Sequence, residues 1–121
     1  MTEKLSQSQR VHLSRVRVTG GFWRRWMDVN RTVTLPIEYE QCSNTGRLDA
    51  WKLQWKKGDG APPHYFWDSD VAKWIEAVAY GLADAPDPDL EAKVDEVVDW
   101  IEDAQQDDGY LNIHFSIVRP E

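Results

Sequence analysis

Apolar and polar positions follow their clearest pattern between residues 67 and 104. Apolar side chains recur there in two stretches, each at the spacing of one buried helical face. Their positions are Val71, Trp74, Ile75, Val78, Ala79 and Leu82 in the first stretch, and Leu90, Val94, Val97, Val98 and Ile101 in the second. Pro86 ends the first stretch, whereas Asp87 can cap the second and Pro88 suits its first turn. Only a few residues connect the stretches, so we predict two antiparallel helices that form an αα-hairpin.

Polar residues mark both ends of this hairpin. Asp68 or Ser69 can cap the exposed N–H groups of the first helix, and Asp70 complements its dipole. After the second helix, Asp108-Gly109 predicts a turn in which Gly109 takes a positive φ. We expect the chain to leave this turn in extended form over residues 110–115.

The pattern is weaker at the start of the chain. Residues 1–10 are polar and predict a flexible lead-in. Apolar residues then alternate only in part, which predicts a short N-terminal strand or an extended arm that Gly20-Gly21 ends. Phe22, Trp23 and Trp26 follow at the spacing of one helical turn, so we expect them to pack against something larger.

Residues 32–66 predict one short helix and a long loop. Thr32–Leu35 is short and β-branched, and Pro36 ends it. Residues 37–45 follow as a short helix that Gly46 stops. Residues 47–66 lack a clear period, so we expect a long loop anchored by its tryptophans.

Composition narrows the classes of partner. A net charge of −7 and a pI near 4.9 argue against nucleic acid, since phosphate binding relies on clustered Lys and Arg. No stretch approaches the roughly 20 apolar residues that span a bilayer, and the N-terminus lacks the apolar core of a secretory signal. We therefore expect a cytoplasmic location and no membrane partner. Cys42 is the single cysteine, which excludes an internal disulfide and an all-cysteine metal site within one chain.

Seven tryptophans in 121 residues exceed what a small core normally needs. Trp74 and Trp100 stand at helical spacing, so we expect them in the core. For Trp67, at an element boundary, core packing and sugar recognition both remain open. An indole face complements the C–H face of a sugar ring, and its N–H can donate to a hydroxyl.

The predicted hairpin brings two polar segments to one end. Because the helices are antiparallel, the start of the first lies near the end of the second. We expect a rim of carboxylates, amides and an aromatic ring, the chemistry that binds polyhydroxylated ligands. Its candidate substrate-binding residues are Trp67, Asp68, Asp70, Gln106 and Asp108. Structural roles compete with this interpretation: from physics alone, capping by the first two aspartates and turn formation at Asp108 are favoured.

Several blocks of the sequence resemble the N-terminal region of the β-L-arabinofuranosidase family, glycoside hydrolase family 127. The most specific is Phe66-Trp67-Asp68-Ser69-Asp70-Val71-Ala72-Lys73-Trp74-Ile75-Glu76-Ala77, followed by Gln105-Gln106-Asp107-Asp108-Gly109-Tyr110-Leu111-Asn112. Earlier blocks are Gly20-Gly21-Phe22-Trp23, Asn30-Arg31-Thr32-Val33, Tyr39-Glu40-Gln41-Cys42 and Thr45-Gly46-Arg47. The resemblance runs from about residue 11 onward, and its strength lies in the ordered series.

The resemblance implies a mainly α fold, in which the αα-hairpin is a portion of an (α/α)6 toroid. We therefore expect residues 11–121 to be an incomplete N-terminal part of a glycosidase helical-toroid domain. The family implies removal of terminal β-L-arabinofuranose from glycans with retention. Its nucleophile is a cysteine thiolate held on zinc by further cysteines and a glutamate, which makes cysteine usable in a role normally filled by a carboxylate.

This sequence departs from that pattern, because the zinc-site residues lie beyond Glu121 in the family and Cys42 does not match the nucleophile's motif. We expect no catalytic residue and no metal ligand in this chain, zinc only in a full-length relative, and no activity by the chain alone. A carbohydrate is the expected partner, and exposed apolar helix faces suggest self-association. The alternatives are a small carbohydrate-binding or interaction module without catalysis, and a plain helical scaffold.

Overall fold

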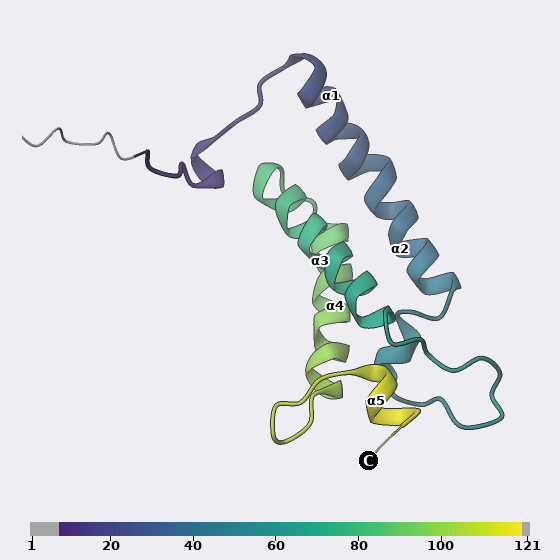
Figure 1. Ribbon diagram of the computed structural model, residues 1–121. Coiled ribbons are helices and arrows are strands. Elements are labelled where there is room, and N and C mark those ends of the chain that lie inside the picture. Colours follow the sequence, from purple (N-terminus) through teal and green to yellow (C-terminus); the bar gives the residue numbers. More distant parts are fainter. Residues whose placement is uncertain (1–7, 120–121) are drawn as a thin grey trace, which may run out of the picture.

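The computed structural model describes residues 8–119, which form helices and their connections (Figure 1). The elements are η1 (Leu13–Arg15), α1 (Gly21–Val29), η2 (Asn30–Thr34), α2 (Leu35–Asn44), η3 (Asp49–Lys52), α3 (Trp67–Asp84), α4 (Pro88–Ala104) and α5 (Ile113–Ile117). No β-strand occurs in residues 8–119, so the mainly α prediction is confirmed. Residues 1–7 of the predicted lead-in lie outside the described part of the chain.

The α3–α4 hairpin is confirmed, with bounds close to those predicted. Asp87 caps α4, since its Oδ1 accepts a hydrogen bond from the Leu90 N–H (3.2 Å). Pro88 occupies the first turn, where its missing N–H leaves no bond unmade. Val78 of α3 and Val97 of α4 are fully buried, as the period of the apolar positions requires.

The start of α3 differs from the prediction. Neither Asp68 nor Ser69 caps it: Phe66 occupies the cap position and makes no side-chain bond there. The Ser69 hydroxyl instead donates to the Phe66 carbonyl (2.8 Å). Asp68 accepts from the N–H of Ile113, a partner 45 residues away that local sequence rules cannot identify.

Helices α1, η2 and α2 join into one long rod beside α3 (Figure 1). The β-branched segment Thr32–Leu35 lies inside this rod, because Asn30 and Thr34 both keep helical backbone angles. Pro36 has no N–H to donate to the carbonyl one turn earlier. The wide π-helical turn η2 lies directly before Pro36 and accommodates this missing hydrogen bond. Gly46 (φ 79°) then ends α2, as predicted.

The two ends of the described chain also correct the sequence predictions. We predicted a strand or an extended arm over residues 11–18, and no strand forms there. Leu13–Arg15 make a single 3₁₀ turn between the extended residues His12 and Val16. After α4, Gly109 adopts the predicted positive φ (87°). The predicted extended run 110–115 is wrong, because Asn112 caps α5 by accepting from the Phe115 N–H (2.9 Å).

The core lies where α2, η3, α3, α4 and α5 meet. Its buried members are Leu35, Cys42, Leu48, Ala50, Trp51, Val71, Trp74, Val78, Leu90, Val97, Ala104 and Ile113. The Trp74 indole N–H donates to the Leu35 carbonyl (3.0 Å) and fixes α3 against the rod. Trp100 packs against this core and Trp74 belongs to it, as predicted.

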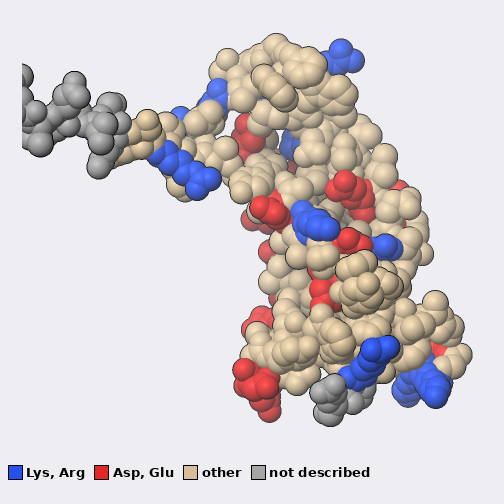
Figure 2. Space-filling view, in the orientation of Figure 1, with Lys and Arg blue, Asp and Glu red and all other residues tan. Residues whose placement is uncertain are grey.

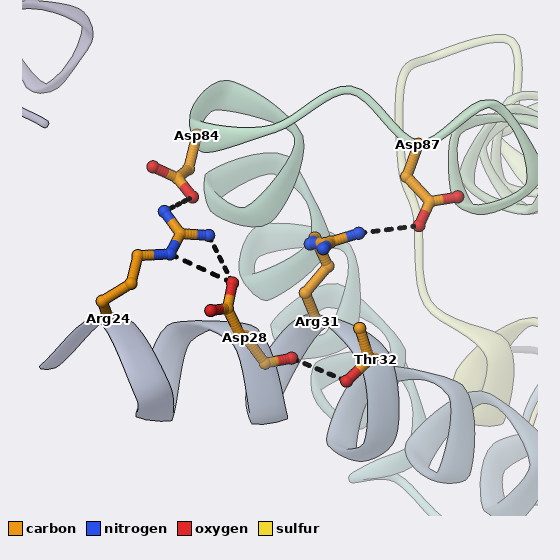
Figure 3. A network of polar contacts seen from close by, with 6 residues as sticks. All are labelled: Arg24, Asp28, Arg31, Thr32, Asp84 and Asp87. Atoms are coloured by element: carbon orange, nitrogen blue, oxygen red, sulfur yellow. Dashed lines mark hydrogen bonds and ion pairs between the residues drawn. The ribbon is translucent and has the colours of Figure 1, made fainter. Parts of the chain in front are cut away.

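Helix α1 buries no residue and is attached by charge (Figure 3). Arg24 Nη1 donates to Asp84 Oδ2 at the end of α3 (2.8 Å), and Arg24 Nε donates to Asp28 Oδ1 (3.0 Å). Further along the rod, Arg31 lies 3.6 Å from Asp87, the cap of α4. Two arginines of the rod thus hold the two aspartates that flank the hairpin turn.

Within residues 8–119, no helix has both the length and the apolar character needed to cross a membrane.

Candidate functional site

Trp67 stands at the start of α3 and is half-buried. Its ring lies against the turn that ends α2, with the Arg47 guanidinium carbon 5.4 Å from the ring centroid. A Cβ at Gly46 would be 3.7 Å from the same ring. The C-terminal turn of α2 therefore sets the position of this indole.

Asp70 is held between two cations one turn later. Its Oδ2 accepts from Arg47 Nε (2.9 Å), and its Oδ1 lies 3.6 Å from Lys73 Nζ. The Arg47 bond is the main reason that the pKa of Asp70 lies below its usual value, and Lys73 adds to the effect. Asp70 is thus a fixed carboxylate at ordinary pH.

Two hollows meet at this charged cluster, and both are lined by Arg47, Asp70 and Lys73. One, of about 560 Å³, lies between α2 and α3; the other, of about 570 Å³, lies beside Trp67. We call them together the α2–α3 groove. Its further lining residues are Glu38, Gln41, Cys42, Thr45, Trp74 and Ala77 in the first part and His64, Phe66, Trp67 and Ser69 in the second. Apolar floor, charged rim and aromatic wall suit a hydroxyl-rich ligand.

A third hollow, of about 740 Å³, lies on the loop side of Trp67. Trp55 and Trp67 both line it, together with the ion pair between Lys52 Nζ and Asp49 Oδ1 (2.8 Å). The Trp55 indole N–H is buried without a hydrogen-bond partner. Trp67 therefore separates the α2–α3 groove from an aromatic-lined hollow under the loop.

Asp68 belongs to a different environment, although it is next to Trp67. Its Oδ2 accepts from the Ile113 N–H (3.2 Å), while its Oδ1 is buried without a partner. Burial raises the pKa of Asp68, and the Ile113 N–H and the nearby His114 offset only part of that rise. The half-buried carboxyl joins α3 to α5 and lines neither part of the groove.

Gln106 and Asp108 lie in the exposed turn before α5. The Gln106 side-chain amide donates to the Ser116 hydroxyl (3.2 Å), and Asp108 Oδ1 accepts from the Tyr110 N–H (2.9 Å). These bonds shape the turn and fasten it to α5. Neither residue lines the α2–α3 groove.

The five candidate residues therefore fall into two groups. Trp67 and Asp70 share the groove, whereas Asp68 and Gln106 bond to α5 and Asp108 shapes the turn before it. The groove also contains residues without a predicted role, Arg47, Lys73, Glu38 and Gln41. Arg47 stands in the family-resembling block Thr45-Gly46-Arg47, but no local signal connects it with its partner Asp70, which lies 23 residues further along the chain.

Cys42 forms part of the groove floor. It is a free, buried thiol, and burial is the main reason that its pKa lies above its usual value. The thiol is therefore protonated at neutral pH and is a poor nucleophile. Among residues 8–119, no group of three or more His, Cys, Asp or Glu side chains is placed to hold a metal ion.

A comparison with known families now identifies the chain. Residues 15–120 match the model of the β-L-arabinofuranosidase GH127 catalytic domain. The chain belongs to this family. Among curated proteins, the chain is similar to the non-reducing end β-L-arabinofuranosidase of Bifidobacterium longum subsp. longum, with 56% identity over 52 residues. The aligned stretch covers 43% of this chain and 8% of that protein.

Solved GH127 structures share the fold. The β-L-arabinofuranosidase from Geobacillus stearothermophilus T6 superposes with a TM-score of 0.73 at 34% identity, over 83% of this chain and 17% of that one. A second GH127 β-arabinofuranosidase gives a TM-score of 0.78 at 30% identity, over 90% of this chain and 18% of that one. The predicted portion of a GH127 helical toroid is thus confirmed. The chain spans less than a fifth of each relative's length.

Proposed function

We propose that residues 15–119 form one wall of the sugar-binding cavity of a β-L-arabinofuranosidase, within the incomplete catalytic toroid formed by residues 11–121. The observation that carries the proposal is the family match over residues 15–120. The α2–α3 groove supports it, because the most family-specific block of the sequence supplies Trp67, Asp70 and Lys73 to this groove.

Trp67 and Asp70 are the residues we propose to contact the sugar. A fixed carboxylate accepts hydrogen bonds from vicinal hydroxyls, and the half-buried indole offers a face to the sugar's C–H groups. Arg47 holds both, since it bonds to Asp70 and lies against Trp67. This arrangement is formed before ligand arrives, so little rotamer freedom is lost on binding. Asp68, Gln106 and Asp108 then act on the sugar indirectly, by positioning α5 and the start of α3.

We further propose that the chain alone does not hydrolyse glycosides. The family's chemistry implies a zinc-held cysteine thiolate and retention of configuration, and the described residues do not fit zinc. Cys42 is a protonated, buried thiol without a set of ligands around it. We therefore assign no step of the reaction to this chain, only recognition of the terminal β-L-arabinofuranose.

A chimera tests the proposal. Residues 15–119 replace the matching segment of the Geobacillus stearothermophilus enzyme, and release of p-nitrophenol from p-nitrophenyl β-L-arabinofuranoside is measured. We expect the chimera to turn over and the isolated chain to show none. Trp67→Ala and Asp70→Asn in the chimera should each lower kcat/KM by about tenfold or more, since Trp67→Ala removes a stacking contact and Asp70→Asn removes a charged acceptor.

The control is Asp95→Asn, a matched change at an exposed carboxylate of α4, which should leave kcat/KM unchanged. Unchanged kcat/KM in both groove variants would contradict the assignment of the groove. Turnover by the isolated chain would contradict its incompleteness.

The hollow between Trp55 and Trp67 favours a second candidate, a carbohydrate-binding or interaction module without catalysis. Two indoles with nearby charged groups are typical of sugar recognition. This candidate requires saturable binding by the isolated chain. A change of tryptophan fluorescence with methyl β-L-arabinofuranoside that Trp55→Ala abolishes would favour it over the catalytic-domain proposal.

A further inference from the structure

The α1–α2 rod has two unlike faces. Its inner face meets the hairpin through Arg24, Arg31 and the buried Leu35. On the opposite side, at helical spacing, lie four exposed apolar side chains that we call the outer stripe. They are Phe22, Trp26, Val33 and Ile37. The buried residues of the rod lie on its inner face, so the outer stripe has no partner among residues 8–119.

Exposure of the outer stripe is large. Phe22 is 65% exposed and Trp26 is 52% exposed, and the adjoining Trp23, whose ring meets Phe22 edge-on at 5.1 Å, is 69% exposed. The surface over α1, at the top of Figure 2, is largely without charge. The N-terminal arm does not occupy this side, because η1 lies against α3. Clusters of this size mark association sites.

We propose that a second copy of this chain docks on the outer stripe, with the two rods antiparallel. The area suits that occupant. Aromatic side chains bury about 150–250 Å² each, so the exposed parts of the stripe and Trp23 sum to roughly 500 Å². Interfaces are about 60% apolar, which scales this to roughly 800 Å² per partner, the size of a stable interface.

The spacing of the stripe fixes the direction. Phe22 and Ile37 lie at equal distances in sequence from Val29-Asn30, and so do Trp26 and Val33. Under a two-fold axis at that midpoint, each aromatic ring meets an aliphatic side chain of the other copy, so large faces small at every layer. Parallel rods would instead place Trp26 against Trp26. Antiparallel order also opposes the helix dipoles.

Charge at the two ends agrees with this order. Arg25 lies exposed near the start of the rod, and Glu40 lies exposed near its end. Antiparallel rods bring the basic end of one copy to the acidic end of the other, whereas parallel rods bring like charges together. The partner that the stripe fits is therefore another such rod in reverse direction.

Sedimentation equilibrium of the 121-residue chain tests the proposal. We expect a reversible dimer of twice 14.1 kDa with micromolar dissociation. Trp26→Glu and Ile37→Glu should each raise the dissociation constant by more than about tenfold, because each places a charge in an apolar interface. Tyr80→Glu, at a 58% exposed aromatic on α3, is the matched control and should leave the dimer intact. Far-ultraviolet circular dichroism should be unchanged in all three, because the replaced residues are exposed.

Cysteine cross-linking gives an independent readout of direction. Val29→Cys lies at the midpoint and should form an intermolecular disulfide, whereas Ile37→Cys in one copy would be about 22 Å from its equivalent at 1.5 Å per residue. Cross-linking at both positions would show parallel rods and overturn the antiparallel arrangement. A dimer indifferent to Trp26→Glu and Ile37→Glu would overturn the docking site. A free chain that stays monomeric at all concentrations would overturn it too, and would leave helices of a longer catalytic domain as the cover of the stripe.

Discussion

The carboxyl group of Asp68 is held between α3 and α5 with one oxygen bonded to Ile113 N–H and the other buried without a partner. Because burial raises its pKa, native Asp68 keeps its proton to a higher pH than the unfolded chain does. Between the ordinary value of 3.8 and the raised native pKa, the native state binds more protons, so the free energy of unfolding falls as pH rises. The effect of Asp70 on stability has the opposite sign. Because its pKa is lowered in the native state, its charge stabilises the fold above pH 3.8, and this stabilisation is lost as the pH falls through the native pKa.

Asp68→Asn should therefore stabilise the chain more at pH 7 than at pH 4. The amide keeps an acceptor for Ile113 N–H and removes the partly desolvated charge. For a half-buried group, we expect the stabilisation by Asp68→Asn at pH 7 to exceed that at pH 4 by about 0.5–1 kcal/mol. Urea unfolding at both pH values measures it, with the exposed Asp95→Asn as control. An equal effect of Asp68→Asn at pH 4 and pH 7 would show that the charge is not what burial penalises.

At the scale of elements, the sequence predicted those parts whose causes are local. Pro86, Asp87 and Pro88 define the α3–α4 turn within three residues, and the structure agrees. The rod α1–α2 was predicted only in pieces, because packing of Leu35 and the polar attachment of Arg24 and Arg31 override the β-branched segment. The Arg47–Asp70 pair was not predicted either, since nothing local relates residues 23 apart.

Two effects of Asp87 in the hairpin turn, its capping of α4 and its ion pair with Arg31, can be measured separately. Asp87 caps α4 through Leu90 N–H and also faces Arg31 at 3.6 Å. Asp87→Ala loses both and should lower the free energy of unfolding by about 1 kcal/mol. Asp87→Asn keeps the cap and should cost only a few tenths, as expected for a partly exposed ion pair. Thermal unfolding by circular dichroism ranks the variants, and equal losses in both would mean that the ion pair, not the cap, carries the effect.

At the scale of the whole molecule, stability is distributed unevenly along the chain. The side chains of Val71 and Val78 in α3 and of Val97 in α4 are completely buried, whereas α1 buries no residue and depends on Arg24 and its carboxylate partners. Local opening free energies follow buried apolar contact, so α1 should open long before the hairpin does. The outer stripe makes this difference depend on association, because a second copy would cover the same helix.

Hydrogen exchange separates these contributions. In Trp26→Glu, which we expect to be monomeric, amides of Gly21–Val29 should exchange much faster than those of α3. Salt should accelerate them further, because the Arg24–Asp84 pair is partly exposed and salt screens it. In the unsubstituted chain, protection of α1 should rise with protein concentration while α3 stays constant. If α1 in the monomeric variant is as protected as α3 and indifferent to salt, then its attachment to the hairpin does not depend on charge.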